Sequence, residues 1–340
     1  MRAIPADRLY IGPDALPWSA GRLTSGRASG VIARHDIIWR RALCGIVGLF
    51  LKSPGLEPEL GRLTSLMLHE MCDRGPDSAG FAVYAAPESG VTKICAVAAP
   101  GSVDWAATAR ALGKALGAAV DTHEIEDHAI LKTKGDGEAA RRWLIDQVPA
   151  ATILSQGGSI EMFKGVGDPD AIARRLDLAG FSGTHAIGHT RMATESAVTI
   201  AGSHPFSTGS DTCLVHNGSL SNHNRLRERL KKRGERFQTE NDTEVAAAYL
   251  AWRMKDGDTL QAALENALND LDGFYTFVVG TRDGFAVLRD PVACKPAVMA
   301  ETDDWVAFGS EFRALAALPG VEGARIWEPA PATVYAWSRA

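Results

Sequence analysis

The run CGIVGLF at residues 44–50 is the feature that most constrains the fold of this chain. It is short, apolar and uninterrupted, which is typical of a buried strand. A buried strand needs further layers around it, so the rest of the chain must supply strands and helices that cover it. The run also begins with a cysteine that follows 43 residues of different character.

Residues 1–43 differ from the remainder in both pattern and charge. They show little periodicity, contain Pro5, Pro13 and Pro17, and carry a net charge of +4 within a chain whose total is −5. Such a segment is typical of a poorly ordered extension. Three origins are open: a propeptide that is removed, a start codon assigned too early, or a retained arginine-rich tail. Leu43 fits the second, because a UUG codon encodes leucine internally but starts a chain with methionine.

The overall composition excludes several classes of protein. The 340 residues are 46% hydrophobic and 23% charged, as in ordinary globular chains. No apolar run reaches about 18 residues, so no membrane span is expected, and the acidic balance gives no reason to expect nucleic acid as a partner. The five cysteines are widely spaced without a metal-ligand pattern, which predicts no metal or cofactor site and favours reduced thiols in the cytoplasm.

The apolar pattern after residue 44 predicts an α+β fold. Leu60, Leu63, Met67 and Met71 repeat at helical spacing, and residues 79–84 form the next strand. Residues 91–180 read as an inserted small α/β subdomain with helices at 103–119, 137–148 and 169–178. The main pattern then resumes with strands, helices at 222–234, 241–255 and 258–270, further strands, and a short helix at 311–318. This order favours two antiparallel sheets with helices outside them, within one domain over residues 44–340.

Five separated motifs carry polar residues suited to one chemistry. They are Cys44-Gly45-Ile46-Val47-Gly48, the run 74–80 (RGPDSAG), Gly188-His189-Thr190-Arg191, His216-Asn217-Gly218 and Asn241-Asp242-Thr243-Glu244. Together and in this order they resemble class II glutamine amidotransferases, which are N-terminal nucleophile hydrolases. The resemblance covers about residues 44–337 and implies a four-layer αββα sandwich.

The resemblance implies that Cys44 is the nucleophile that attacks the side-chain amide of glutamine. Its own α-amine would be the base, since a free α-amine has a pKa near 7.7–8.0 and is substantially neutral in the cell. Asn217 and Gly218 would stabilise the oxyanion. Standing alone, Cys44 would be a buried strand cysteine and Asn-Gly a hairpin turn.

The substrate-binding residues implied by the resemblance are Arg191, Asp242, Thr194, Arg74 and Gly75. The planar guanidinium of Arg191 suits the glutamine carboxylate, and Asp242 suits the ammonium group. Thr194 would hydrogen-bond substrate, while Arg74 and Gly75 would shape the pocket beside the nucleophile. The plainer alternatives are a surface ion pair for Arg191 and a helix N-cap for Asp242.

This sequence departs from many relatives after Arg191, where Met192 replaces an aromatic residue and Glu195 replaces a residue that is often polar or histidine. The departure points away from the glucosamine-phosphate synthase branch.

No motif for an ammonia acceptor is found, so the acceptor is expected on another polypeptide. The closest resemblance is to the amidotransferase subunit of glutamate-synthase-like and N-methylglutamate synthase complexes, whose partner subunits carry flavin and iron–sulfur groups. Two other interpretations are open. One is the glutaminase half of another amidotransferase or a free-standing amide hydrolase. The other is a non-catalytic regulatory subunit whose Cys44 never becomes N-terminal.

Overall fold

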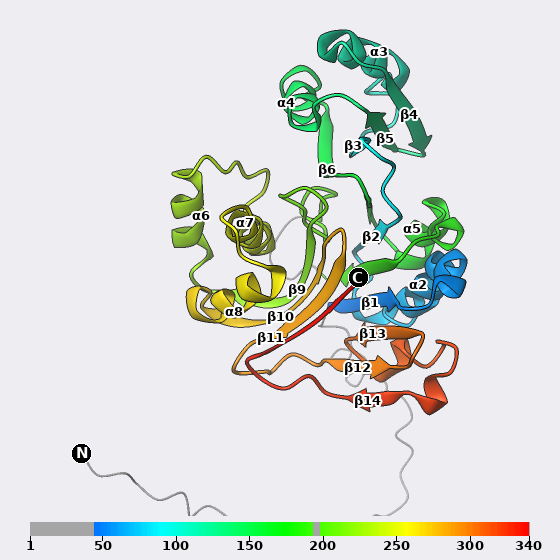
Figure 1. The fold of residues 1–340 in the computed structure, drawn as a ribbon, viewed down its shortest axis with the longest axis vertical. Coiled ribbons are helices and arrows are strands. Elements are labelled where there is room, and N and C mark those ends of the chain that lie inside the picture. The colour runs from blue at the N-terminus through cyan, green and yellow to red at the C-terminus, as the bar shows by residue number, and fades with distance from the viewer. Residues whose placement is uncertain (1–43, 193–197, 340) are drawn as a thin grey trace, which may run out of the picture.

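The computed structural model describes residues 44–192 and 198–339 of the chain. The extension expected at 1–43 lies outside the described residues. Two sheets form the body, and a third belongs to an insert (Figure 1). Among the described helices, none is long and apolar enough to cross a membrane.

The larger body sheet has seven antiparallel strands with β1 at its centre. The CGIVGLF run supplies β1, which is buried along its whole length, as the sequence predicted. The strand order is β14(Arg325–Trp327), β12(Val298–Glu301), β13(Trp305–Gly309), β1(Gly45–Leu51), β8(His185–Arg191), β2(Ser78–Tyr84) and β7(Ile160–Val166). The sequence did not predict β14, because its three residues are too few to show a period.

The smaller body sheet packs against the first through an apolar layer. Its strand order is β15(Thr333–Ser338), β11(Gly284–Arg289), β10(Gly273–Gly280) and β9(Cys213–Leu220). A Cβ on Gly48 would lie 2.6 Å from the Phe285 ring, so this glycine sets how closely the sheets approach. The Tyr84 hydroxyl donates a hydrogen bond across the layer to the Gly280 carbonyl at 2.8 Å.

Helices cover both outer faces of the paired sheets. Figure 1 shows α6(His223–Lys231), α7(Asp242–Lys255) and α8(Leu260–Asp270) on one side, with α2(Leu60–His69) and α5(Pro169–Arg175) on the other. The predicted four-layer αββα fold is therefore confirmed. The helix expected at 311–318 is wrong, because this segment contains only a 3₁₀ turn at Phe312–Ala314.

The insert is shorter than the sequence suggested. Its sheet has the order β4(Val120–Ile125), β5(His128–Thr133), β3(Thr92–Ala98) and β6(Ala151–Gly157), with α3(Trp105–Leu116) after β3 and α4(Gly137–Gln147) after β5. This βαββαβ order is the ferredoxin-like arrangement. Residues 160–175 form β7 and α5, and β7 pairs with β2 of the body. The expected boundary at residue 180 is therefore too late.

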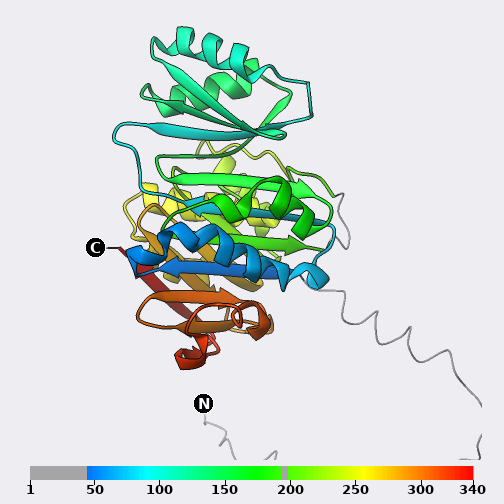
Figure 2. The same ribbon diagram turned by 90° about the vertical axis from the view of Figure 1, so that its right-hand side faces the viewer.

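Alternating side chains fasten the insert to the body. Along β3, Ile94 and Ala96 face α3 and α4, whereas Cys95 and Val97 join the apolar core of the body. Successive strand residues point to opposite faces, so both faces of this short sheet are buried. Figure 2 shows the insert stacked on the end of the sandwich.

Candidate active site

Cys44 directly precedes β1 and lies among cationic side chains. Its thiol faces the Met192 carbonyl oxygen, with sulfur and oxygen 3.9 Å apart. Burial raises the pKa of the Cys44 thiol, and the opposing influences of the Met192 carbonyl and of Arg191, Lys295 and Arg74 do not overcome it. In the described part of the chain no histidine or carboxylate is hydrogen-bonded to this thiol. The nucleophile therefore needs a base from elsewhere, which a free α-amine would supply.

Two predicted site residues meet at the backbone carbonyl of Cys44. Arg74 Nε and Asn217 Nδ2 each donate a hydrogen bond to this oxygen at 3.1 Å. Arg74 is also paired with Glu311. Because an amide nitrogen carries two hydrogens, Asn217 keeps a second donor for a ligand beside the thiol.

The segment that carries Arg74 is fixed against the end of β8. A Cβ on Gly75 would lie 2.4–2.5 Å from backbone atoms of Thr190 and Arg191, so only glycine fits there. The Asp77 backbone N–H donates to the Arg191 carbonyl at 3.1 Å. Arg191 is 7% exposed, and its charge acts on the Cys44 thiol, so the structure places its side chain in a buried position close to Cys44.

Gly218 follows Asn217 in β9 and has a backbone that other residues rarely adopt. Its φ is +145°, and a Cβ there would lie 2.0 Å from the Phe274 carbonyl oxygen and 2.9 Å from His216 Nε2. Asn217 and Gly218 pair with Thr276 and Tyr275 of β10, so they belong to a strand and do not form a hairpin turn.

Asp242 is the first residue of α7, and Asn241 rather than Asp242 is the N-cap. One Asp242 carboxylate oxygen accepts the Leu220 N–H at 2.9 Å, and the other lies 3.6 Å from His216 Nδ1. Burial alone would raise the pKa of this carboxyl, but His216 and the Leu220 N–H outweigh it and lower the pKa to about 2. Asp242 is therefore ionised at neutral pH and suited to an ammonium group.

Buried histidines connect β8 and β9 with the start of α7. The His189 and His204 rings stack with centroids 4.0 Å apart, and the Thr243 hydroxyl contacts His204 Nε2 at 2.8 Å and His216 Nδ1 at 3.1 Å. Burial lowers the pKa of His189 to about 3 and that of His204 well below its usual value. His189, which lies within a predicted motif, is thus a neutral structural residue next to Arg191.

These histidines predict a loss of stability in mild acid. Burial also lowers the pKa of His185 to about 3. Each such group binds a proton in the unfolded chain below about pH 6.5 but not in the folded chain, so stability falls as the pH drops from 6.5 towards 3. We expect the free energy of unfolding to fall by about 1 kcal/mol per pH unit for each histidine. Urea unfolding between pH 7 and 4 measures this pH dependence, and His185→Gln should remove about one third of it. A free energy of unfolding that stays constant over this range would contradict the assignment.

Sequence reasoning missed three residues that support the site. Lys295 acts on the Cys44 thiol from the segment between β11 and β12. Ser310 Oγ accepts the Ile46 N–H at 2.9 Å, and Glu311 pairs with Arg74. Ser310 and Glu311 follow β13, which pairs with β1. Only this strand pairing shows that they lie close to Cys44 and Arg74. Thr194 lies outside the described residues.

One group of side chains is spaced closely enough to hold a metal ion. The ligand atoms of His69, Cys72 and Asp170 lie within 4.8 Å of one another in the described part of the chain. His69 Nδ1 and an Asp170 carboxylate oxygen are 2.6 Å apart, and this hydrogen bond raises the pKa of His69. An ion pair accounts for the closeness of these two residues without a metal.

Comparison with known proteins identifies clear relatives. A family model described as a glutamine amidotransferase domain matches residues 189–317. The glutamine amidotransferase-like protein GlxB of Rhizobium meliloti (strain 1021) is 55% identical over 296 residues, which cover 87% of this chain and 98% of that protein. A putative glutamine amidotransferase of Methanothermobacter thermautotrophicus is 35% identical over 280 residues, which cover 79% of this chain and 92% of that protein.

A solved structure supports the fold. Glutamine phosphoribosylpyrophosphate amidotransferase from B. subtilis superposes with a TM-score of 0.56 at 22% identity, over 87% of this chain and 47% of that one.

Proposed function

The chain belongs to the class II glutamine amidotransferases, and from this premise we propose that it hydrolyses L-glutamine through a thioester on Cys44 and supplies the ammonia to a separate synthase subunit. The observation that carries the proposal is the meeting of Arg74 and Asn217 on the Cys44 carbonyl, beside Arg191. A nucleophile, an oxyanion donor and a carboxylate-binding cation are the parts that amide hydrolysis requires.

The reaction requires Cys44 at the N-terminus with a free α-amine, whether residues 1–43 are cut off or never translated. This amine takes the thiol proton, and the thiolate attacks the side-chain amide carbon of glutamine. Asn217 Nδ2 and the Gly218 N–H stabilise the oxyanion. The carbon–nitrogen bond breaks as the protonated α-amine returns its proton to the leaving group, which departs as ammonia. Water, deprotonated by the same amine, then hydrolyses the thioester to glutamate.

The amino-acid end of glutamine is bound by opposite charges. Arg191 receives the carboxylate in a two-pronged hydrogen bond, and Asp242 receives the ammonium group. Arg74 and Gly75 shape the pocket, and Thr194 supplies a further hydrogen bond. The ionised state of Asp242 supports this assignment, because its pKa of about 2 keeps its charge throughout the neutral range.

Arg191→Lys is expected to raise the KM for glutamine by about 10- to 100-fold while kcat changes little, because lysine cannot reproduce the two-pronged contact. Steady-state glutaminase kinetics measure both constants. Arg62→Lys, on the exposed side of α2, is the matched control and should leave both unchanged. An unchanged KM with a large fall in kcat would contradict the binding role of Arg191.

The ammonia acceptor is proposed to be a subunit of a glutamate or N-methylglutamate synthase type complex, with flavin and iron–sulfur groups in the partner. The described elements are all accounted for by the sandwich and its insert, so no acceptor site is assigned to them. We place the reaction in the cytoplasm, where thiols stay reduced, and the five cysteines are free. Affinity purification from the native host tests the partnership: a co-purifying flavoprotein supports it, and an isolated active glutaminase favours a free-standing amide hydrolase.

A further inference from the structure

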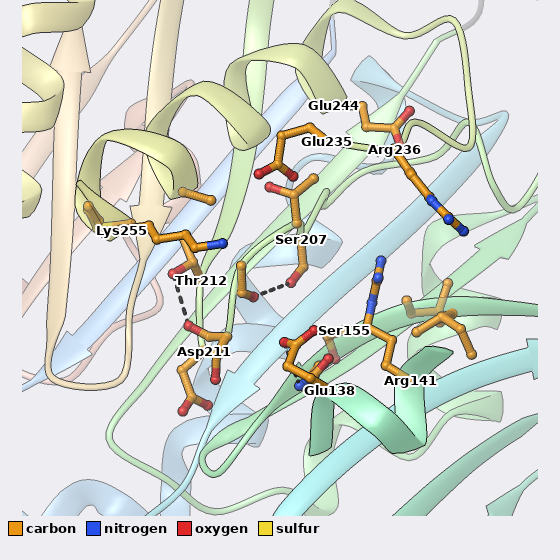
Figure 3. Close-up of a pocket in the computed structure, with 18 of the residues that line it drawn as sticks. Glu138, Arg141, Ser155, Ser207, Asp211, Thr212, Glu235, Arg236, Glu244 and Lys255 are labelled. Carbon is orange, nitrogen blue, oxygen red and sulfur yellow. Dashed lines mark hydrogen bonds between the residues drawn. The ribbon is translucent and has the colours of Figure 1, made fainter. Parts of the chain in front are cut away.

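A cavity of about 960 Å³ lies where the insert meets the body, apart from Cys44. Its walls come from α4 and β6 of the insert and, on the body, from α7, residues 207–212, residues 234–238 and the turn 281–283. We call it the insert cleft. Its volume is at the upper end of the range for small-molecule sites. Figure 3 shows polar side chains pointing into it from both walls.

The acidic side chains of the insert cleft are mostly bound within the protein. Glu244 accepts the backbone N–H groups of Gln238 and Thr239 at 2.7 and 2.8 Å. Asp211 accepts three backbone N–H groups from residues 158–160 and pairs with Arg282. Glu138 accepts a hydrogen bond from Gln156. Glu235 and Asp283 are the acidic lining residues whose carboxylates lack such a partner in the described chain.

The basic side chains are in the opposite situation. Within residues 44–192 and 198–339, no ion pair or hydrogen bond involves the side chains of four lining residues, namely Arg141, Arg142, Arg236 and Lys255. Figure 3 shows Arg141 on the insert and Arg236 on the body extending towards each other across the cleft. Facing guanidinium groups repel each other, and an anion between them removes the repulsion and accepts hydrogen bonds from both.

We propose that the insert cleft binds a small polyanion, of the phosphate or polycarboxylate class, that bridges Arg141 and Arg236. Five acidic and five basic side chains line the cleft, so its formal charges balance overall, and the facing guanidinium groups of Arg141 and Arg236 are the local pair of positive charges that such an anion neutralises. The Ser207 hydroxyl also lines this space, where it donates a 3.4 Å hydrogen bond to the Gly209 carbonyl (Figure 3).

The loop between α6 and α7 connects the insert cleft with the substrate site. It carries Arg236, and its next residues are held by Glu244 and by a 3.2 Å hydrogen bond from Gln238 to the Ile153 carbonyl of β6. It ends at Asn241, the cap of α7, directly before Asp242. An anion that fixes Arg236 therefore changes the affinity for glutamine at Asp242, and this consequence alone rests on the proposed function.

Calorimetric titration of the full chain carrying Cys44→Ala tests the site without glutamine turnover. Inorganic pyrophosphate and citrate are titrated separately, so that a response to one alone identifies the phosphate or the carboxylate class. We expect saturable binding of at least one probe, weakened at least about 10-fold in Arg141→Glu/Arg236→Glu. Arg110→Glu, an exposed residue of α3 outside the cleft, is the matched control and should bind as the parent does.

Binding of neither probe at 10 mM (about the weakest affinity worth assigning to a site), or equal binding by the double variant and the parent, would overturn the proposal. If the double variant fails to fold by circular dichroism, the single variants Arg141→Glu and Arg236→Glu replace it with the same expectations. Binding without glutaminase activity in the uncut or processed protein would refute the proposed function but leave this site intact. Active glutaminase without anion binding would refute this site but leave the proposed function intact.

Discussion

Replacing Cys44 with alanine is expected to lower kcat for glutamine hydrolysis by on the order of 10⁶-fold, the loss that follows removal of a hydrolase nucleophile. Among the cysteines of the described structure, Cys44 is the one whose backbone carbonyl accepts hydrogen bonds from Arg74 and Asn217. Ammonia release from the chain that begins at residue 44 measures the effect. Thermal unfolding should change little, because Cys44 precedes β1 and lies outside its strand pairing.

Cys294→Ala is the matched control for this substitution. Cys294 is exposed and free, so its removal should leave kcat unchanged. The chain that retains residues 1–43 should be as inactive as Cys44→Ala, because an amide nitrogen cannot accept the thiol proton. Full activity of that longer chain would show that the base is another group, and the α-amine mechanism would be abandoned.

Asn217→Ala is expected to lower kcat by about 10²–10³-fold with a smaller change in KM, because an oxyanion donor acts mainly in the transition state. The Asn217 amide lies against the Cys44 carbonyl, and Gly218 holds the strand in a conformation that a side chain would prevent. Steady-state kinetics separate the two constants, and circular dichroism confirms that the variant is folded.

The control for this second substitution is Asn222→Ala. Asn222 donates to the Asp270 carbonyl and accepts the Asp272 N–H, so it joins α6 to the end of α8 without approaching Cys44. Its loss should lower stability and leave kcat unchanged. If Asn217→Ala behaved in the same way, Asn217 would be a structural residue and the oxyanion donor would have to be sought elsewhere.

Most of the sandwich was predictable because its elements have strong local signals. The strand at 45–51 is continuously apolar, and α7 starts at a polar N-cap followed by acidic residues. The insert boundary was not predictable. β7 is apolar like the insert strands before it, and only its pairing with β2 assigns it to the body. The ferredoxin-like order likewise depends on long-range pairing that no local pattern encodes.

The candidate site was predictable where a motif carried it. Cys44, Arg74, Gly75, Arg191 and Asn217 were expected and lie together at the start of β1 and the end of β8. Gly218 and Asp242 were also expected; Gly218 follows Asn217 in β9, and Asp242 contacts Leu220 at the end of this strand. Glu311 and Lys295 were missed because each reaches the site from a separate turn. The neutral state of His189 also required the structure, since burial cannot be read from a histidine in a motif.

The most direct test of the central claim is the intact mass of the protein purified from its native host, together with its N-terminal sequence. The account predicts a chain that begins at Cys44, whether residues 1–43 are cut off or never translated. A native, active chain that begins at Met1 would contradict it, because Cys44 would then have no α-amine to serve as the base.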